Sequence, residues 1–315
     1  MGPAHSTGFL YLVVRIPQGG EMEKSRAPLA KRTGFAYLRC MDTIPGSAQS
    51  RLRQYGAFNG LGLWTLYKRE VGRFLKVWMQ TVFAPVVTTL LFMTVFKLAF
   101  GDRGRLTGDF EGMNYNDFLA PGLIMMAILQ NAFSNTSSSL LQAKFNATHV
   151  DFLMPPLSPL ELTIAFLGGA VTRGLVVAAI SAIAIQLSGL ANLHVAHIWP
   201  IVWFTLTSAI ILGALGAYGG IWADKFDHLA AVTNFIIVPL TFLSGTFYDI
   251  KVMVEPFQTL AYLNPIFYMI DGYRYGHLGV ANGSILVGAI YTGVLALASM
   301  IWIWLLFRRG YKLKA

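Results

Sequence analysis

Long apolar segments with few polar positions inside them dominate the hydrophobicity pattern of the chain. A helix needs about 20 mostly apolar residues to cross the ~30 Å hydrocarbon core of a bilayer. Six segments meet this condition: Met79–Phe100, Phe118–Leu140, Thr163–Ser188, Ile198–Trp222, Ala230–Tyr248 and Ser284–Phe307. The pattern therefore predicts an all-α integral membrane protein with six transmembrane helices, whose transmembrane domain covers residues 79–315.

The second predicted helix is the least apolar of the six, because its last third is polar. The sequence from Asn131 to Ser139 contains two asparagines, one threonine and four serines. Polar residues at membrane depth usually face the interior of a helix bundle or a cavity. We therefore expect this helix to lie inside the assembly rather than against lipid.

Before the first span, aromatic and basic residues alternate. Trp64, Tyr67, Val71, Phe74, Leu75 and Trp78 recur at helical spacing, and Lys68, Arg69, Arg73 and Lys76 fall largely between them. This pattern predicts an amphipathic helix over residues 58–78 that lies in the membrane interface, where cations meet anionic lipid. The alternative is an ordinary beginning of the first span. Residues 1–57 have no sustained periodicity, and we expect a disordered N-terminal extension there, with Met41 as an alternative start.

The segment Asp249–Gly283, between the fifth and sixth spans, has apolar runs that are too short to cross a membrane. Pro256 and Pro265 interrupt these runs. Because proline disfavours helix at the preceding residue, Asn264-Pro265 predicts a bend between two short helices. We expect a re-entrant extracytoplasmic helical hairpin, since irregular backbone at membrane depth is tolerated only when protein shields it. The alternative is a plain loop whose aromatic residues anchor at the interface.

The composition places the chain in a membrane and orients it. Hydrophobic residues make up 55% of the chain and charged residues only 12%, which excludes a soluble fold. Most of the 24 Lys and Arg residues fall on the side of the two termini, so both termini are expected to be cytoplasmic. The net charge of +9 is explained by this membrane asymmetry, so no nucleic acid partner is expected.

The connection between the second and third spans is unusually apolar for a loop outside the membrane. Ser158, Pro159 and Glu161 have the spacing of a helix start with a capping box. Exposed apolar side chains of a short helix in this loop need a cover. A partner protein and the chain's own membrane helices are both possible covers on this evidence.

Several motifs resemble one family in their order and spacing. They are Pro121–Met126, Ala143–Phe145, Pro155–Pro159, Arg173-Gly174, Leu263–Ile266 and Tyr268–Gly276. On these motifs, the stretch from Leu61 to Ala315 resembles a permease subunit of an ABC exporter of the ABC-2 type. Residues 79–315 would then be an ABC-2 type transmembrane domain in the bacterial cytoplasmic (inner) membrane, preceded by the interfacial helix.

The resemblance implies partners and a coupling surface. Two copies of an ABC ATPase subunit would use ATP and Mg, and a second copy of the permease would complete a homodimer in contact with membrane lipids. The loop after the second span would be the coupling helix. Its candidate contact residues are Phe145, Asn146, Asp151, Phe152, Leu153, Met154, Pro155, Pro156 and Glu161.

The chain itself carries no nucleotide-binding loop and no sign of catalysis. It lacks any Gly-Lys dipeptide and therefore the G-x-x-x-x-G-K-[ST] motif. We expect it to bind no cofactor and no metal and to act as a transport subunit rather than an enzyme. His194 and His197 are more simply part of a short turn than metal ligands. A stand-alone channel or secondary transporter, which needs no ATPase, is the alternative function.

The substrate pathway is expected between two copies, lined by the first, second and fifth helices. The substrate would be amphiphilic, lipid-like, drug-like or a polysaccharide. Candidate pathway residues are Phe133, Asn135, Ser138, Tyr262, Phe267 and Tyr268. Arg173 lies ten residues into the third span, where an unpaired cation would be costly, and we expect it to form a structural ion pair.

Overall fold

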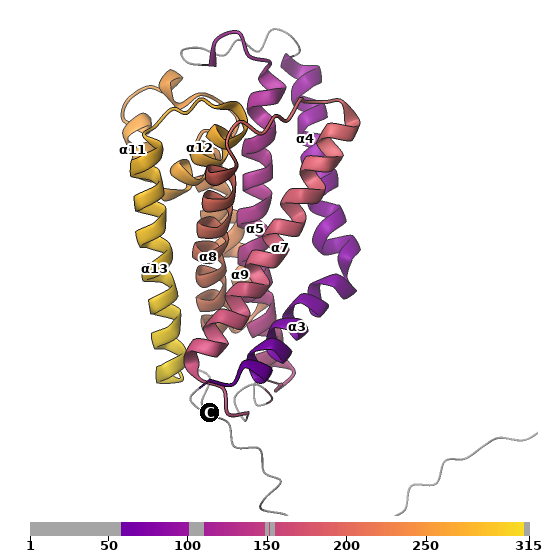
Figure 1. The fold of residues 1–315 in the computed structure, drawn as a ribbon, viewed down its shortest axis with the longest axis vertical. Coiled ribbons are helices and arrows are strands. Elements are labelled where there is room, and N and C mark those ends of the chain that lie inside the picture. The colour runs from indigo at the N-terminus through magenta and orange to yellow at the C-terminus, as the bar shows by residue number, and fades with distance from the viewer. Residues whose placement is uncertain (1–57, 101–109, 149–150, 152–154, 312–315) are drawn as a thin grey trace, which may run out of the picture. The chain divides into compact units, whose positions relative to one another are not determined.

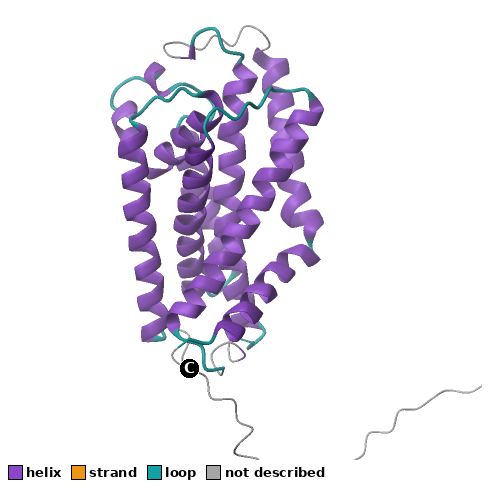
Figure 2. Cartoon of the chain, in the orientation of Figure 1, coloured by secondary structure: helices purple, strands orange, loops and turns teal. Residues whose placement is uncertain are grey.

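The computed structural model describes residues 58–100, 110–148, 151 and 155–311. Among these residues every regular element is a helix, and the chain elsewhere in this part consists of turns and loops (Figure 1, Figure 2). The described residues all belong to one structural unit, which runs from Tyr55 to Ala315. The all-α expectation is confirmed for them.

Six helical segments are long and apolar enough to cross a membrane, as predicted. They are Met79–Ala99, Tyr115–Phe145, Pro159–Ser188, Ile198–Trp222, Phe226–Leu243 and Ile285–Arg309. The first consists of η2 (Met79–Phe83) and α4 (Ala84–Phe100), and the fifth consists of α9 (Phe226–Val232), η5 (Thr233–Ile237) and α10 (Val238–Leu243). The other four are α5, α7, α8 and α13 in chain order.

The fifth span begins at Phe226, before the predicted Ala230, and it ends early, at Leu243, because a glycine terminates the helix. Ser244 caps α10, and Gly245 follows with φ of 72°. This left-handed conformation is the usual way in which glycine terminates a helix. The Thr246 hydroxyl donates to the Thr241 carbonyl over 2.6 Å and fixes the turn. The predicted end at Tyr248 is therefore wrong.

Helix α5 lies inside the bundle, while α4 and α13 lie on opposite sides of it (Figure 1). In the most apolar part of α5, 72% of the residues are buried, a larger share than in any other span of the described chain. Glycines of α8 allow close contact with it: a Cβ added at Gly216 would lie 2.3 Å from the Phe133 carbonyl oxygen, and one at Gly220 2.7 Å from that of Ser137. The expectation that the second span is an inner helix is confirmed.

A separate helix, α3 (Gly60–Lys76), precedes the first span and runs obliquely across one end of the bundle (Figure 1). We call this the α3 end. The helix packs against α7, where the Tyr67 hydroxyl contacts the Thr172 hydroxyl at 2.7 Å. Its regular backbone stops at Val77, and the Thr81 hydroxyl donates across this break to the Phe74 carbonyl. The helix predicted over residues 58–78 is therefore distinct from the first span.

At the opposite end, which we call the α11 end, two short helices meet as the sequence suggested. They are α11 (Phe257–Leu263) and α12 (Pro265–Leu278), and they are preceded by the 3-10 turn η6 (Ile250–Val252). Asn264 stands at the bend: its side chain accepts from the backbone N–H of Ile266 and donates to the Leu240 carbonyl over 2.9 Å. These bonds fasten the bend to the end of α10.

Arg274 of α12 fastens this end of the bundle to α5. It is 1% exposed and donates to the carbonyls of Phe118 and Gly245 over 3.3 and 2.8 Å. Its guanidinium lies 3.8 Å from the centre of the Phe118 ring. Asp271, one turn earlier, accepts from two backbone N–H groups at residues 282 and 283. The buried charges of Asp271 and Arg274 thus have hydrogen-bond partners in the neighbouring backbone.

Candidate functional site

One row of side chains along α5 is not covered by the rest of the described chain. Between Phe118 and Ala143 every residue of this helix is buried except five, which are spaced four apart. These five are Met126, Gln130, Ser134, Ser138 and Gln142. Residues four apart lie on the same face of a helix. We call this row the open stripe; four of its five side chains are polar.

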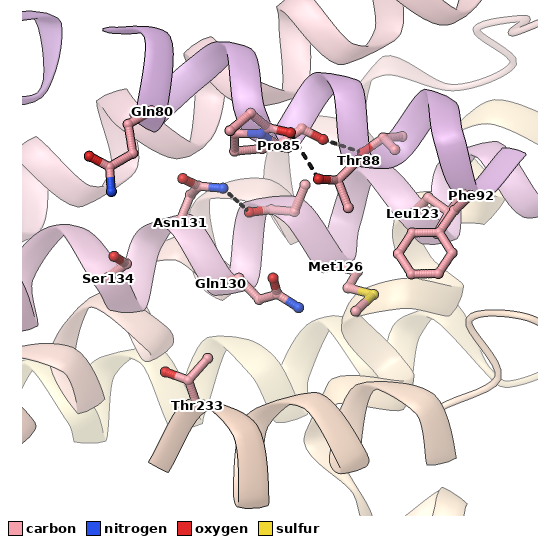
Figure 3. Close-up of a pocket in the computed structure, with 13 residues that line it drawn as sticks. Gln80, Pro85, Thr88, Phe92, Leu123, Met126, Gln130, Asn131, Ser134 and Thr233 are labelled. Atoms are coloured by element: carbon pink, nitrogen blue, oxygen red, sulfur yellow. Dashed lines mark hydrogen bonds between the residues drawn. The ribbon is translucent and has the colours of Figure 1, made fainter. Parts of the chain in front are cut away.

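The open stripe borders a cavity of about 360 Å³ between the first, second and fifth spans (Figure 3). Gln80 of η2 and Thr233 of η5 lie on either side of Gln130 and Ser134. Both flanking segments have π-helical backbone, which occurs frequently at functional sites. The remaining lining residues include Pro85, Thr88, Phe92, Leu123 and Ala127. This smaller cavity combines amide and hydroxyl groups with apolar surface, and no charged side chain is among the described residues that line it.

A larger cavity of about 990 Å³ adjoins it at the α3 end. Gln80 and Ser134 line both cavities, so together they form one polar groove. The cationic residues of the larger cavity are Lys68, Arg69, Arg73, Lys76 and Arg173. No carboxylate is among the described residues that line it.

Arg73 holds α3 against α5 through a buried network. Its Nη2 donates to the Asn135 backbone carbonyl over 2.6 Å and lies 3.3 Å from a carboxylate oxygen of Glu70. The other oxygen of Glu70 accepts from the Ser139 hydroxyl over 2.8 Å. Glu70 is 1% exposed, so its charge depends on these partners. The network neutralises one cation of the groove and fixes α3, which also carries Lys68, Arg69 and Lys76.

Arg173 has an amide partner where the sequence predicted an ion pair. It is 6% exposed, and its Nε and Nη2 both donate to the side-chain oxygen of Asn131, over 3.2 and 2.7 Å. No Asp or Glu of the described chain forms a salt bridge with it. The structure therefore replaces the predicted ion pair with a hydrogen bond to an amide. The amide orients the guanidinium but leaves its positive charge uncompensated.

The structure separates the three pathway candidates of the second span. Phe133 is buried, with its ring against Gly219 and its carbonyl against Gly216 of α8. Asn135 is buried and holds Arg73. Only Ser138 belongs to the open stripe and lines the groove. Phe133 and Asn135 therefore lie outside the groove, a difference that the spacing of four between polar residues could have indicated.

The aromatic candidates of the short helices form a cluster of their own at the α11 end. The ring centre of Phe267 lies 5.1 Å from that of Tyr262 and 5.0 Å from that of Tyr268. Tyr268 also contacts Tyr291 of α13 at 5.5 Å. None of these residues lines either cavity of the groove.

The coupling candidates lie at the α3 end. Exposed among them are Phe145, Asn146, Asp151, Pro155 and Pro156; Phe152, Leu153 and Met154 fall outside the described residues. The Phe145 ring stacks on Phe226, with ring centres 5.4 Å apart. Lys144 donates to the carbonyls at residues 221 and 223 over 3.0 and 2.8 Å. The end of α5 and the turn before α9 thus share one surface.

Glu161 is buried rather than exposed on this surface. It forms the predicted capping box with Ser158, which donates its backbone N–H over 2.6 Å and accepts from the backbone N–H of Glu161 over 3.3 Å. Its other oxygen accepts from the backbone N–H of Asn59, the residue that caps α3. Glu161 therefore joins the starts of α7 and α3 and is 1% exposed.

Comparisons with known proteins agree with the architecture. Residues 62–278 match the family described as ABC-2 type transporter. The chain is 34% identical over 260 residues to the inner membrane transport permease YadH of Escherichia coli (strain K12), covering 81% of this chain and 98% of that protein. It is 22% identical over 240 residues to nodulation protein J of Rhizobium leguminosarum bv. viciae, covering 75% of this chain and 89% of that protein.

Three observations agree on what the chain is: its six apolar helices, the family match, and the similarity to an inner membrane permease. The motifs that suggested the family lie largely inside the matched region, from Pro121 to Gly276. The chain belongs to the ABC-2 type transporter family, as a multi-pass transport permease of the inner membrane.

Proposed function

We propose that the chain is the permease subunit of an ATP-driven exporter that moves an amphiphilic substrate. The observation that carries the proposal is the polar groove beside the open stripe of α5. A row of amide and hydroxyl groups at membrane depth is unfavourable against lipid. A cavity that contains both polar and apolar surface suits a substrate with both characters.

A second copy of the chain would complete the groove. The first and fifth spans flank the open stripe. Only 22% and 17% of the residues in their most apolar parts are buried, against 72% for the second span. A homodimer that joins these faces would remove the stripe from lipid and place the groove between two copies. The pathway would then be lined by α4, α5 and the helices of the fifth span.

In this arrangement the α3 end faces the cytoplasm, with both termini on that side. The basic residues of α3 would then lie at the level of the anionic headgroups of the inner leaflet, which suits an interfacial helix. The short helices α11 and α12 would re-enter from the opposite side. Their attachment to α10 and α5 through Asn264 and Arg274 supports a shielded hairpin rather than a free loop.

A separate ABC ATPase would bind ATP and Mg and dock on the exposed surface at the α3 end. Phe145 and the two prolines at 155 and 156 are apolar contacts available on this surface. The apolar residues at 152–154, outside the described part, remain candidates for the same contact. Movement of the loop would reach α3 through the bonds of Glu161 to Ser158 and Asn59, and it would reach α5 directly.

Co-purification tests the proposal against a channel or secondary transporter that needs no ATPase. The tagged full chain, extracted from bacterial membranes in a mild detergent, should retain an ABC ATPase that mass spectrometry identifies. A Phe145→Asp variant should lose most of this ATPase, because a charge in an apolar contact is costly. A Tyr311→Asp variant is the matched control, because it places the same charge on an exposed aromatic residue just after α13, at the same end but outside this surface.

The expected result is retention of the ATPase by the wild-type chain and by Tyr311→Asp, and loss by Phe145→Asp with an unchanged melting temperature. Substrate-dependent transport by the purified permease alone would overturn the ATP-driven reading. Equal retention by all three chains would place the ATPase contact elsewhere and remove Phe145 from it.

A further inference from the structure

The groove contains a positive charge, that of Arg173, for which no described residue provides a salt bridge. Arg173 reaches the cavity at the α3 end, although it is 94% buried, and its only hydrogen-bond partner in the described chain is the neutral amide of Asn131. Its Nη1 makes no hydrogen bond to any described residue. A guanidinium held in place with one edge unused is suited to an anion, since arginine recognises phosphate and carboxylate through paired donors.

The surroundings of Arg173 add to this charge. Lys68, Arg69 and Lys76 line the same cavity, and Glu70, the carboxylate of the same helix, is bound to Arg73 and Ser139. A purely structural set of basic residues at a membrane surface would point towards the lipid headgroups around the protein. Here the basic side chains share a cavity with a buried arginine and with the polar residues Ser134 and Ser138.

The two parts of the groove differ in chemistry along its length. The part at the α3 end is large and basic, whereas the part next to it is smaller, uncharged and lined by apolar groups such as Phe92 and Leu123. A lipid of the cytoplasmic leaflet has its headgroup at the membrane surface and its chains deeper in the membrane. The order of the basic lining and the apolar lining along the groove therefore matches the order of headgroup and acyl chains in the lipid.

We infer that the transported amphiphile carries an anionic headgroup of the phosphate type, which Arg173 binds together with the lysines of α3. This inference rests on the proposed transport function and specifies its substrate class. Several cations around one site favour a group that can hold more than one negative charge and offers several acceptor oxygens. Gln80 and Ser134, which line both parts of the groove, would contact the substrate where headgroup and chain meet.

Binding of two tail-labelled fluorescent lipids, phosphatidic acid and phosphatidylcholine, tests the headgroup. Fluorescence anisotropy is measured with the purified full chain in a neutral detergent. We expect at least about tenfold tighter binding of phosphatidic acid, the size of effect that one charge-assisted hydrogen bond gives. Arg173→Gln and the double variant Lys68→Gln/Lys76→Gln should each reduce this preference about tenfold.

Control variants separate binding from folding. Arg309→Gln removes an exposed arginine at the same end of the bundle but outside the groove, and it should leave the preference unchanged. Arg173→Lys keeps the charge and should restore part of the preference. Melting of each variant shows whether Arg173→Gln is folded, and the exposed lysine variants give an independent answer if it is not.

The outcomes distinguish the sources of the anion and the two proposals. Displacement of the lipid by millimolar inorganic phosphate would assign the site to a free anion and overturn the amphiphile. Equal binding of both lipids, or equal loss in Arg309→Gln, would overturn the headgroup inference, even if the ATPase still co-purifies. In a reconstituted complex with the ATPase, phosphatidic acid should stimulate ATP hydrolysis; binding without stimulation would identify a resident lipid instead of a substrate.

Discussion

Helix α5 has two polar faces, of which one is packed against neighbouring helices and the other borders a cavity. On the covered face, Thr136 donates to the Gly213 carbonyl over 2.6 Å and Ser139 donates to Glu70. On the open stripe, Gln130 and Ser134 border a cavity. Three of these four residues lie in the polar run from Asn131 to Ser139, and the two faces have similar residue types. The difference shows that polarity at membrane depth does not by itself identify a substrate pathway, because hydroxyl groups also join helices to one another.

The strongest test of this difference is chemical access to the two faces. In a Cys40→Ser background, a Ser134→Cys variant should react with a maleimide at least about tenfold faster than Thr136→Cys, because a buried thiol must wait for local opening. Labelling of the detergent-purified protein is followed by mass spectrometry. Comparable rates at the two positions would mean that the stripe is covered in the assembled protein.

A second test enlarges a residue at the contact between α5 and α8. Gly216→Ala should destabilise the protein by about 1–3 kcal/mol, since the added carbon has no room beside the Phe133 carbonyl. Gly72→Ala of α3 is the matched control, because apart from its own helix backbone and chain neighbours no atom lies within 4 Å of its added Cβ. It should be neutral or stabilising by up to about 1 kcal/mol, the difference in helix propensity. Thermal melting in detergent compares the two, and equal stability would contradict tight packing at Gly216.

The smallest effect is expected from single hydroxyl groups on the two faces. Thr136→Val removes a buried hydrogen bond and should cost about 1 kcal/mol. Ser134→Ala removes an exposed hydroxyl and should change stability by less than about 0.5 kcal/mol. Melting temperatures of both variants measure the difference. A larger loss for Ser134→Ala would indicate that the open stripe is part of the folded core.

Much of the local structure follows from short sequence patterns. The six spans follow from the length of the apolar segments, because the thickness of a bilayer fixes how many residues a helix needs. The start of α7 follows from Ser158 and Glu161, whose side chains satisfy the free N–H groups of the first turn. The bend at Asn264 follows from the proline after it. These features depend on neighbours within a few residues along the chain.

Other features depend on residues that are distant in the sequence. The partner of Arg173 is Asn131, which is 42 residues away, and the buried position of Glu161 depends on Asn59, which is 102 residues away. A polar run such as that from Asn131 to Ser139 predicts that a helix turns inward. It does not state which side of that helix meets a neighbour.

The sequence by itself therefore determined the membrane-spanning helices, their approximate ends, the separate helix before them and the resemblance to a transport family. Only the tertiary structure decided that Ser134 and Gln130, and not Phe133 and Asn135, face the groove. The physical reason is geometric: neighbouring residues of a helix point about 100° apart. Which of these directions is covered is set by the glycines of α8 and by Arg73 of α3, both of which reach α5 from other parts of the chain.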